Sequence, residues 1–227
     1  MEPNKVQWRS RVRLVDEVAD ELRERIYSGS YALGAKLRQE ELAEDLQVSR
    51  TPLREALRVL ESEGLLHSDP GRGVRVVPAD VKKFLEAYQL REVIDGLAAR
   101  LAAASPDAAG QADLSDMIEL QQAALDPWTP PEYTRENVAF HTAVMALADN
   151  EYVAAQAPIV RMTSQVFTPV AILEAAHAAR AVEQHRGIAA AIVARDPEEA
   201  ERLARAHIRS TIDRLTRKDQ DHTQAEA

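Results

Sequence analysis

The segment from Leu37 to Val77 constrains the fold of this chain more than any other part of the sequence. It reads LRQEELAEDLQVSRTPLREALRVLESEGLLHSDPGRGVRVV. Residues 39–46 have the apolar spacing of a short helix, and residues 47–49 interrupt that spacing. A second helix follows, with Ser49 as its N-cap, Pro52 in its first turn and Gly64 as its stop. Two helices joined by so short a turn predict a helix-turn-helix, whose second helix can enter the DNA major groove.

The second helix of this motif carries a basic edge. Arg50, Arg54 and Arg58 follow one another at four-residue steps, on the side opposite the leucines. An arginine side chain can bond guanine at two atoms or straddle a phosphate. Downstream, residues 65–68 and 73–77 are short β-prone runs around a turn at 69–72, so the segment predicts a winged helix-turn-helix. An ordinary charged helix of a bundle explains the arginines alone, without the cap, turn, glycine and hairpin.

The run QEELAEDLQVSRTPLREALRVLESEGLL, followed by GRGVRVV, resembles the DNA-binding domain of GntR-type bacterial transcription regulators. The resemblance implies that the reading helix contacts operator DNA, that the wing tip assists, and that one arginine ahead of the motif touches the DNA backbone. The positions so implied are Ser49, Arg50, Thr51, Pro52 and Arg54 on the reading helix, Arg72 at the wing tip, and Arg38 for the backbone contact.

Composition and length indicate a second domain. The chain has 227 residues, and about 150 of them follow the winged motif, which is enough for a domain. Residues 1–77 hold 13 Lys and Arg against 14 Asp and Glu (net −1), and residues 78–227 hold 15 against 23 (net −8). The total of −9 therefore lies mostly outside the DNA-binding part. Without cysteine, a signal peptide or an apolar run long enough for a membrane span, we expect a cytoplasmic protein.

The expected fold is mainly α: a winged helix-turn-helix with a small β-wing over residues 1–77, and an all-α antiparallel bundle over residues 78–217. In the first domain we expect a first helix over about 14–27, preceded by a basic arm with Lys5, Arg9, Arg11 and Arg13. In the second we expect helices at about 80–105, 113–125, 131–148, 151–166, 170–194 with a break near Arg180, and 197–216. Residues 218–227 are polar and are expected to be disordered.

Histidines on separate helices of this bundle are placed to meet. His185 and His207 are each 11 residues from Asp196, which lies in the turn between two helices. Equal distance from the turn of an antiparallel pair means equal height, so the two imidazoles are expected to face each other. Around a second turn at Asn150, the same reasoning places Arg161 near His141. Asn137 shares a helix face with His141, four residues away.

The runs NVAFH, EQHRGIAAAIVARD and HI, together with LREVIDGLAARLAA, resemble the all-helical FCD effector domain of many GntR regulators. In metal-binding members one Asp and three His hold a divalent ion, and the matching positions here are Asn137, His141, His185 and His207. The resemblance therefore implies a divalent metal of the zinc, nickel or manganese class. Asparagine supplies no negative charge, so the alternative is a hydrogen-bonded polar cluster without metal.

The functional expectation is a transcription repressor that binds double-stranded operator DNA as a homodimer and responds to a small organic or sugar acid. Arg91 and Arg161 are the candidates for binding the effector's carboxylate, although Arg91 could instead form a helix-surface pair with Asp95. Two alternatives remain, a metal-dependent hydrolase with a three-histidine site and a DNA binder without effector. Against the hydrolase, no general acid or base stands at an obvious spacing from the histidines.

Overall fold

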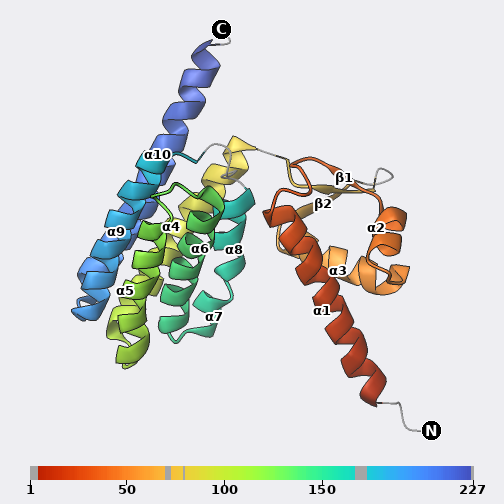
Figure 1. Ribbon diagram of the computed structural model, residues 1–227, viewed down its shortest axis with the longest axis horizontal. Coiled ribbons are helices and arrows are strands. Elements are labelled where there is room, and N and C mark those ends of the chain that lie inside the picture. Colours follow the sequence, from red (N-terminus) through yellow and green to blue (C-terminus); the bar gives the residue numbers. More distant parts are fainter. Residues whose placement is uncertain (1–4, 70–72, 79, 167–172, 226–227) are drawn as a thin grey trace. The chain divides into compact units, whose positions relative to one another are not determined.

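The computed structural model describes residues 5–69, 73–78, 80–166 and 173–225 (Figure 1). The chain divides into two compact units, residues 1–79 and residues 80–227, which we call the N-terminal unit and the C-terminal unit. Within the described residues, no helix is long and apolar enough to cross a membrane.

The N-terminal unit is a winged helix-turn-helix. Its helices are α1 (Lys5–Tyr27), α2 (Gln39–Asp45) and α3 (Arg50–Ser62), and its strands are β1 (Lys36–Leu37), β2 (Leu66–Asp69) and β3 (Gly73–Val76). The strands form an antiparallel sheet in the order β1-β3-β2, so β3 is central. β1 pairs with β3 through only two residues, and no strand was predicted at these positions.

Leucines hold the helix-turn-helix together. α1 packs against α3, and Leu22 of α1 and Leu53 and Leu60 of α3 expose no surface. Ser49 occupies the N-cap of α3 with an extended backbone, but its side chain makes no capping hydrogen bond. Gly64 follows the helix with φ of 76°, a left-handed conformation that glycine adopts without strain. The predicted helix boundaries are therefore confirmed, and the predicted cap is confirmed only in position.

The basic N-terminal arm was wrong as a structural prediction. α1 begins at Lys5, so the four basic residues lie on that helix and not ahead of it. The sequence after Pro3 has no glycine or proline before Gly29, which lets the helix extend toward the terminus. Arg13, the last of the four, forms an exposed ion pair with Glu17 one turn further along.

The C-terminal unit is a helical bundle with mostly small side chains at its tightest contacts. It contains α4 (Val81–Ala104), α5 (Ala108–Ala123), α6 (Pro130–Leu147), α7 (Glu151–Ala154), α8 (Ala157–Arg161), the π-helical segment η1 (Met162–Val166), α9 (Ala175–Val193) and α10 (Pro197–Ala225). The carboxylate of Asp80 caps α4 by accepting from the backbone N–H groups of Lys82 and Lys83. α4 and α10 pack side by side, and Ala98 and Ala102 are fully buried.

Three predicted segments of this unit differ from the structure. Residues 151–166 form two short helices and a π-helical segment, because Pro158 lacks an N–H and starts a new helix. α9 passes through Arg180 without a break, and residues 167–172 lie outside the described part of the chain. α10 continues through residues 218–225, which were expected to be disordered, because no glycine or proline follows Pro197 to end the helix.

Candidate functional site

The predicted DNA-reading edge of α3 is exposed. Ser49, Arg50, Thr51 and Arg54 are all exposed at or near the start of the helix. Pro52, which the family resemblance also assigned to DNA contact, is buried against the core, so its contribution is to the helix start and packing. Arg72 lies outside the described residues.

Two of the predicted DNA-contacting arginines are paired with carboxylates. Arg50 Nη2 lies 2.9 Å from Glu40 Oε1, and Arg38 Nη1 lies 2.8 Å from Glu41 Oε1. All four side chains are more than 60% exposed. Ion pairs between side chains so exposed contribute about 0–1 kcal/mol, so a phosphate or a guanine edge can replace the carboxylate at little cost.

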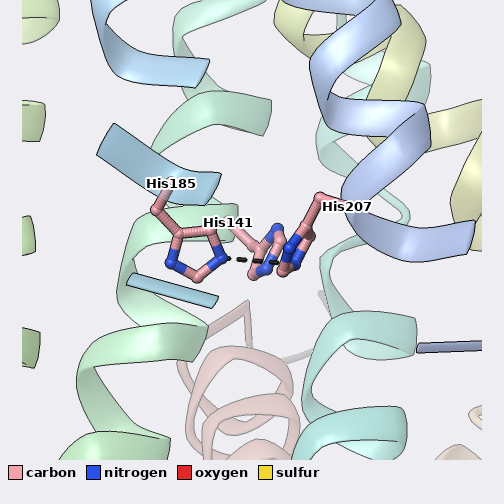
Figure 2. Close-up of side chains that lie close together, drawn as sticks. All are labelled: His141, His185 and His207. Atoms are coloured by element: carbon pink, nitrogen blue, oxygen red, sulfur yellow. Dashed lines mark hydrogen bonds between the residues drawn. The ribbon is translucent and has the colours of Figure 1, made fainter. Parts of the chain in front are cut away.

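Three histidines converge in the interior of the C-terminal unit. His141 comes from α6, His185 from α9 and His207 from α10, and all three are buried. One ligand nitrogen from each lies within 4.8 Å of the others (Figure 2). His185 Nε2 is 3.2 Å from His207 Nε2, which confirms the meeting predicted from their equal distance to Asp196.

An oxygen atom faces the Nδ1 nitrogen of each histidine. The pairs are His141 with Asp95 Oδ2 at 3.0 Å, His185 with Gln121 Oε1 at 2.7 Å, and His207 with Gln184 Oε1 at 2.8 Å. Carboxylate and amide oxygens only accept, so each Nδ1 carries the proton and each Nε2 is left with a lone pair. The sequence analysis did not identify these three acceptors.

The neutral histidines leave two lone pairs facing each other. With both protons on Nδ1, the 3.2 Å contact between His185 Nε2 and His207 Nε2 has no proton to share. Two nitrogens bound to one tetrahedral metal at about 2.1 Å are themselves about 3.4 Å apart, close to this separation. Histidines that bind a metal through one ring nitrogen usually donate the N–H of the other nitrogen to an oxygen acceptor, as all three do here. The donor set therefore fits a divalent cation.

Burial keeps these imidazoles neutral. It lowers the pKa of His207 to about 3, with further lowering from His141 and Arg91. Burial also holds the pKa of His185 well below its ordinary value, and the neighbouring His207 and His141 add to the effect. For His141, burial and Arg91 lower the pKa more than the contact with Asp95 raises it. Metal binding to a histidine requires the neutral form, so the cluster is prepared for it.

Asn137 lies beside the histidines but contributes no charge. It is half-buried on α6, lines the same pocket as His141 and His207, and its Nδ2 donates to Ser164 Oγ at 3.4 Å. That contact uses the amide nitrogen and leaves the amide oxygen as the atom that can bind a cation.

Arg91 forms a buried ion pair and not the surface pair considered above. Its Nη2 lies 2.6 Å from Asp95 Oδ2, its Nη1 donates to Thr163 Oγ1 at 2.9 Å, and the side chains of Arg91 and Asp95 are 2% and 5% exposed. Burial alone would raise the pKa of Asp95, but Arg91 and the His141 N–H outweigh it and hold that pKa well below its usual range. The charges of Arg91 and Asp95 therefore compensate each other.

A polar pocket of about 350 Å³ opens beside the cluster. α4, α6, η1, α9 and α10 supply its lining, which includes Arg91, Asn137, His141 and His207. Its volume is within the range of small-molecule sites. Arg161 is exposed on α8 and is not part of the described lining, so the structure does not bring it to the predicted effector site. The lining also contains three arginines that were not among the predicted site residues: Arg180, Arg214 and Arg217.

Comparisons with known proteins match both units. The model of the family described as bacterial regulatory proteins, gntR family, matches residues 14–76, and the FCD domain model matches residues 86–210. A probable D-xylose utilization operon transcriptional repressor of Paenarthrobacter nicotinovorans is 29% identical over 88% of this chain and 87% of its own length. An uncharacterized HTH-type regulator in an unstable DNA locus of Streptomyces ambofaciens is 30% identical over 86% and 82%. The gluconate operon repressor of Bacillus licheniformis is 32% identical over 64% and 60%.

Solved structures share the same fold. E. coli McbR/YncC superposes with a TM-score of 0.77 and 23% identity over 90% of this chain and 98% of its own. A putative GntR transcriptional regulator from Rhodococcus sp. RHA1 gives a TM-score of 0.73 and 21% identity over 89% and 97%. At these identities the likeness concerns the fold alone.

Proposed function

The chain belongs to the gntR family of bacterial regulatory proteins, in the branch with an FCD domain, and on this premise we propose that it is a repressor controlled by a small acidic effector. It would bind double-stranded operator DNA as a homodimer, and the effector would enter the histidine-lined pocket and weaken that binding. The observation that carries the proposal is the convergence of three neutral histidines, each with its Nδ1 facing an oxygen acceptor, two of which, His141 and His207, line that pocket.

A divalent metal at the histidines accounts for the acidic effector. His141, His185 and His207 would hold the ion through Nε2, and Asn137 would offer its amide oxygen. Bound there, the ion would supply a Lewis-acidic site for a carboxylate. All four ligands are neutral and Asp95 is compensated by Arg91, so the double positive charge would remain uncancelled within a low-dielectric interior. A carboxylate is the natural counter-charge, and the name of one relative refers to an operon for gluconate, a sugar acid.

An exposed apolar stripe on α4 supports dimerisation through the C-terminal unit. Leu90, Val93 and Leu97 follow one another on one face of the helix and are 49%, 49% and 40% exposed. A second copy of this chain is the proposed occupant, because a twofold dimer pairs two reading helices with the two halves of a palindromic operator. The dimer would place its twofold axis in the unit that also binds the effector, which allows the effector to alter the spacing of the reading helices.

The hydrolase alternative loses its support. The relatives found are transcription regulators, and Asp95, the one carboxylate that contacts a histidine of the cluster among the described residues, is held by Arg91 and His141. A group so engaged has no free oxygen in position to act as a general base on water.

The experiment starts with an operator selected from random duplex DNA by the purified full-length protein. Metal content is measured on protein purified without an affinity tag, and operator binding is then titrated with organic and sugar acids before and after chelation. We expect one equivalent of metal per chain and an acid that weakens operator binding only when metal is present. Equal effects of the acid after chelation, with no metal recovered, would leave the histidines as a polar core and remove the metal from the proposal.

A further inference from the structure

The pocket beside the histidines is lined by several arginines. Its described lining contains Arg91, Arg180, Arg214 and Arg217, and it contains no aspartate or glutamate. The surrounding unit is acidic, with 15 Lys and Arg against 23 Asp and Glu over residues 78–227. The described lining is therefore basic in a unit where acidic side chains outnumber basic ones.

These arginines fall into two groups. Arg91 is buried and neutralised by Asp95, so it adds no uncompensated charge. Arg214 is half-buried, Arg180 and Arg217 are exposed, and none of the three forms an ion pair with another described residue. We call Arg180, Arg214 and Arg217 the outer arginines. Three guanidinium groups around one cavity, none of them in an ion pair with a described residue, raise the local concentration of anions and favour an anionic ligand.

The outer arginines lie at some distance from the histidines. Arg214 follows His207 by seven residues of α10, which places it on the same face about 10 Å further along the helix. Arg180 precedes Gln184 by four residues on α9 and therefore shares the face of the residue that anchors His207. Hydroxyl groups of Ser210 and Thr211 line the wall between the two ends. The cavity thus has a histidine end, a hydroxyl-lined middle and a cationic outer end.

We infer that the effector carries two anionic groups, one for the histidine end and a second, carboxylate or phosphate, for the outer arginines. The inference rests on the proposed function, which supplies the first anionic group. A short acid with a single carboxylate would occupy the histidine end and leave the outer arginines unpaired. A chain of about six carbons with an anion at each end, and hydroxyls between them, matches the lining of the cavity from one end to the other.

Three acids with one carbon skeleton test this inference on the metal-loaded full-length protein. Gluconate has one anionic end, glucarate has a carboxylate at both ends, and 6-phosphogluconate has a phosphate at the second end. Adipate and hexanoate form a matched pair without hydroxyls. We expect the doubly charged acids to bind about 10- to 100-fold more tightly than their singly charged partners in calorimetry, the range of one or two charge-assisted hydrogen bonds. Whichever of glucarate and 6-phosphogluconate binds more tightly identifies the second group as carboxylate or phosphate.

Variants then locate the second group. Arg214→Gln and Arg180→Gln should remove most of the preference for the doubly charged acid and weaken gluconate much less, because gluconate has no second anionic group to pair with them. Arg202→Gln serves as the control, because this substitution removes the same charge from α10. Arg202 is exposed, pairs with Glu199 and is not in the described lining. Circular dichroism and metal content confirm that each variant is folded and loaded.

The outcomes separate this inference from the proposed function. If the singly charged acids bind as tightly as their doubly charged partners, or if Arg214→Gln keeps the preference, the second anionic group is excluded and the proposed function stands. If none of the acids binds although the protein still binds its operator, the effector part of the proposed function fails as well. A preference that Arg202→Gln removes as fully as Arg214→Gln would mean a general charge effect and would also overturn the inference.

Discussion

Replacing Asp95 with asparagine tests the buried ion pair that supports the histidine cluster. Asparagine keeps the size of the side chain and an oxygen for the His141 N–H, but it leaves Arg91 charged and unpaired. The side chains of Arg91 and Asp95 are 2% and 5% exposed, so water cannot take over the lost partner. Breaking a buried pair in this way costs about 3–5 kcal/mol, whereas an exposed pair such as Arg13 with Glu17 is worth about 0–1 kcal/mol.

Urea unfolding and thermal melting of the metal-free protein measure this cost. For a unit of the size of residues 80–227, each kcal/mol lowers Tm by about 2–4 °C, so Asp95→Asn should lower it by about 6–20 °C. Glu86→Gln, a control that breaks the exposed pair with Lys82 in the same unit, should lower it by about 4 °C at most. Replacing both partners by apolar residues, Arg91→Met with Asp95→Leu, should recover only part of the loss, because it removes the unpaired charge but leaves the His141 N–H without its acceptor. A Tm within about 2 °C of the wild type for Asp95→Asn would refute the reasoning, because the pair would then behave as if solvated.

Four further predictions follow from other parts of the molecule. Arg54→Ala should weaken operator binding by about 1–3 kcal/mol and relax base preference in gel shifts, with an unchanged preference contradicting the assignment of the reading helix. Asn137→Asp should tighten metal binding and weaken the acidic effector, since the new carboxylate cancels part of the charge that attracts it; calorimetry measures both. In the metal-free protein, His207 has a pKa of about 3 when folded and about 6.5 when unfolded, so protons favour the unfolded state as pH falls below 6.5. The free energy of unfolding should therefore decrease by about 1.4 kcal/mol per pH unit from this residue between pH 6.5 and 3, a slope that His207→Gln should reduce. Val93→Glu should give a monomer in sedimentation, and a persistent dimer would exclude the α4 stripe as the interface.

The sequence predicted those parts of the site that depend on position along a helix. The equal distances of His185 and His207 from Asp196 were enough to bring their imidazoles together, because an antiparallel helix pair turns sequence distance into height. The same reasoning failed for Arg161, since Pro158 divides the predicted helix and the structure leaves Arg161 exposed. The presence of Arg214 in the pocket lining could have been predicted, because Arg214 follows His207 by seven residues and therefore lies on the same helix face.

Other parts of the site had no signal in the sequence. Gln121 reaches His185 from α5, and nothing in a single glutamine on an amphipathic helix indicates which residue it will contact. The π-helical segment brings the hydroxyls of Thr163 and Ser164 to Arg91 and Asn137, and a local change of helical pitch does not follow from side-chain periodicity. Asp95 was visible as the residue four after Arg91, but its burial depends on the packing of the whole bundle.

The Nδ1 anchors make the histidine cluster the meeting point of every long helix in the C-terminal unit. The histidines belong to α6, α9 and α10, while Asp95 belongs to α4 and Gln121 to α5. A close-packed interior cannot absorb the rotation of one imidazole locally, so a shift at any of the three rings must be shared with the helix that holds its anchor. α4, through Asp95, also carries the exposed stripe of Leu90, Val93 and Leu97 on another face. The helix that holds the acceptor of His141 is thus the one whose outer surface would contact the second subunit of the proposed dimer, so a change at the centre of the bundle would reach the dimer interface through a single helix.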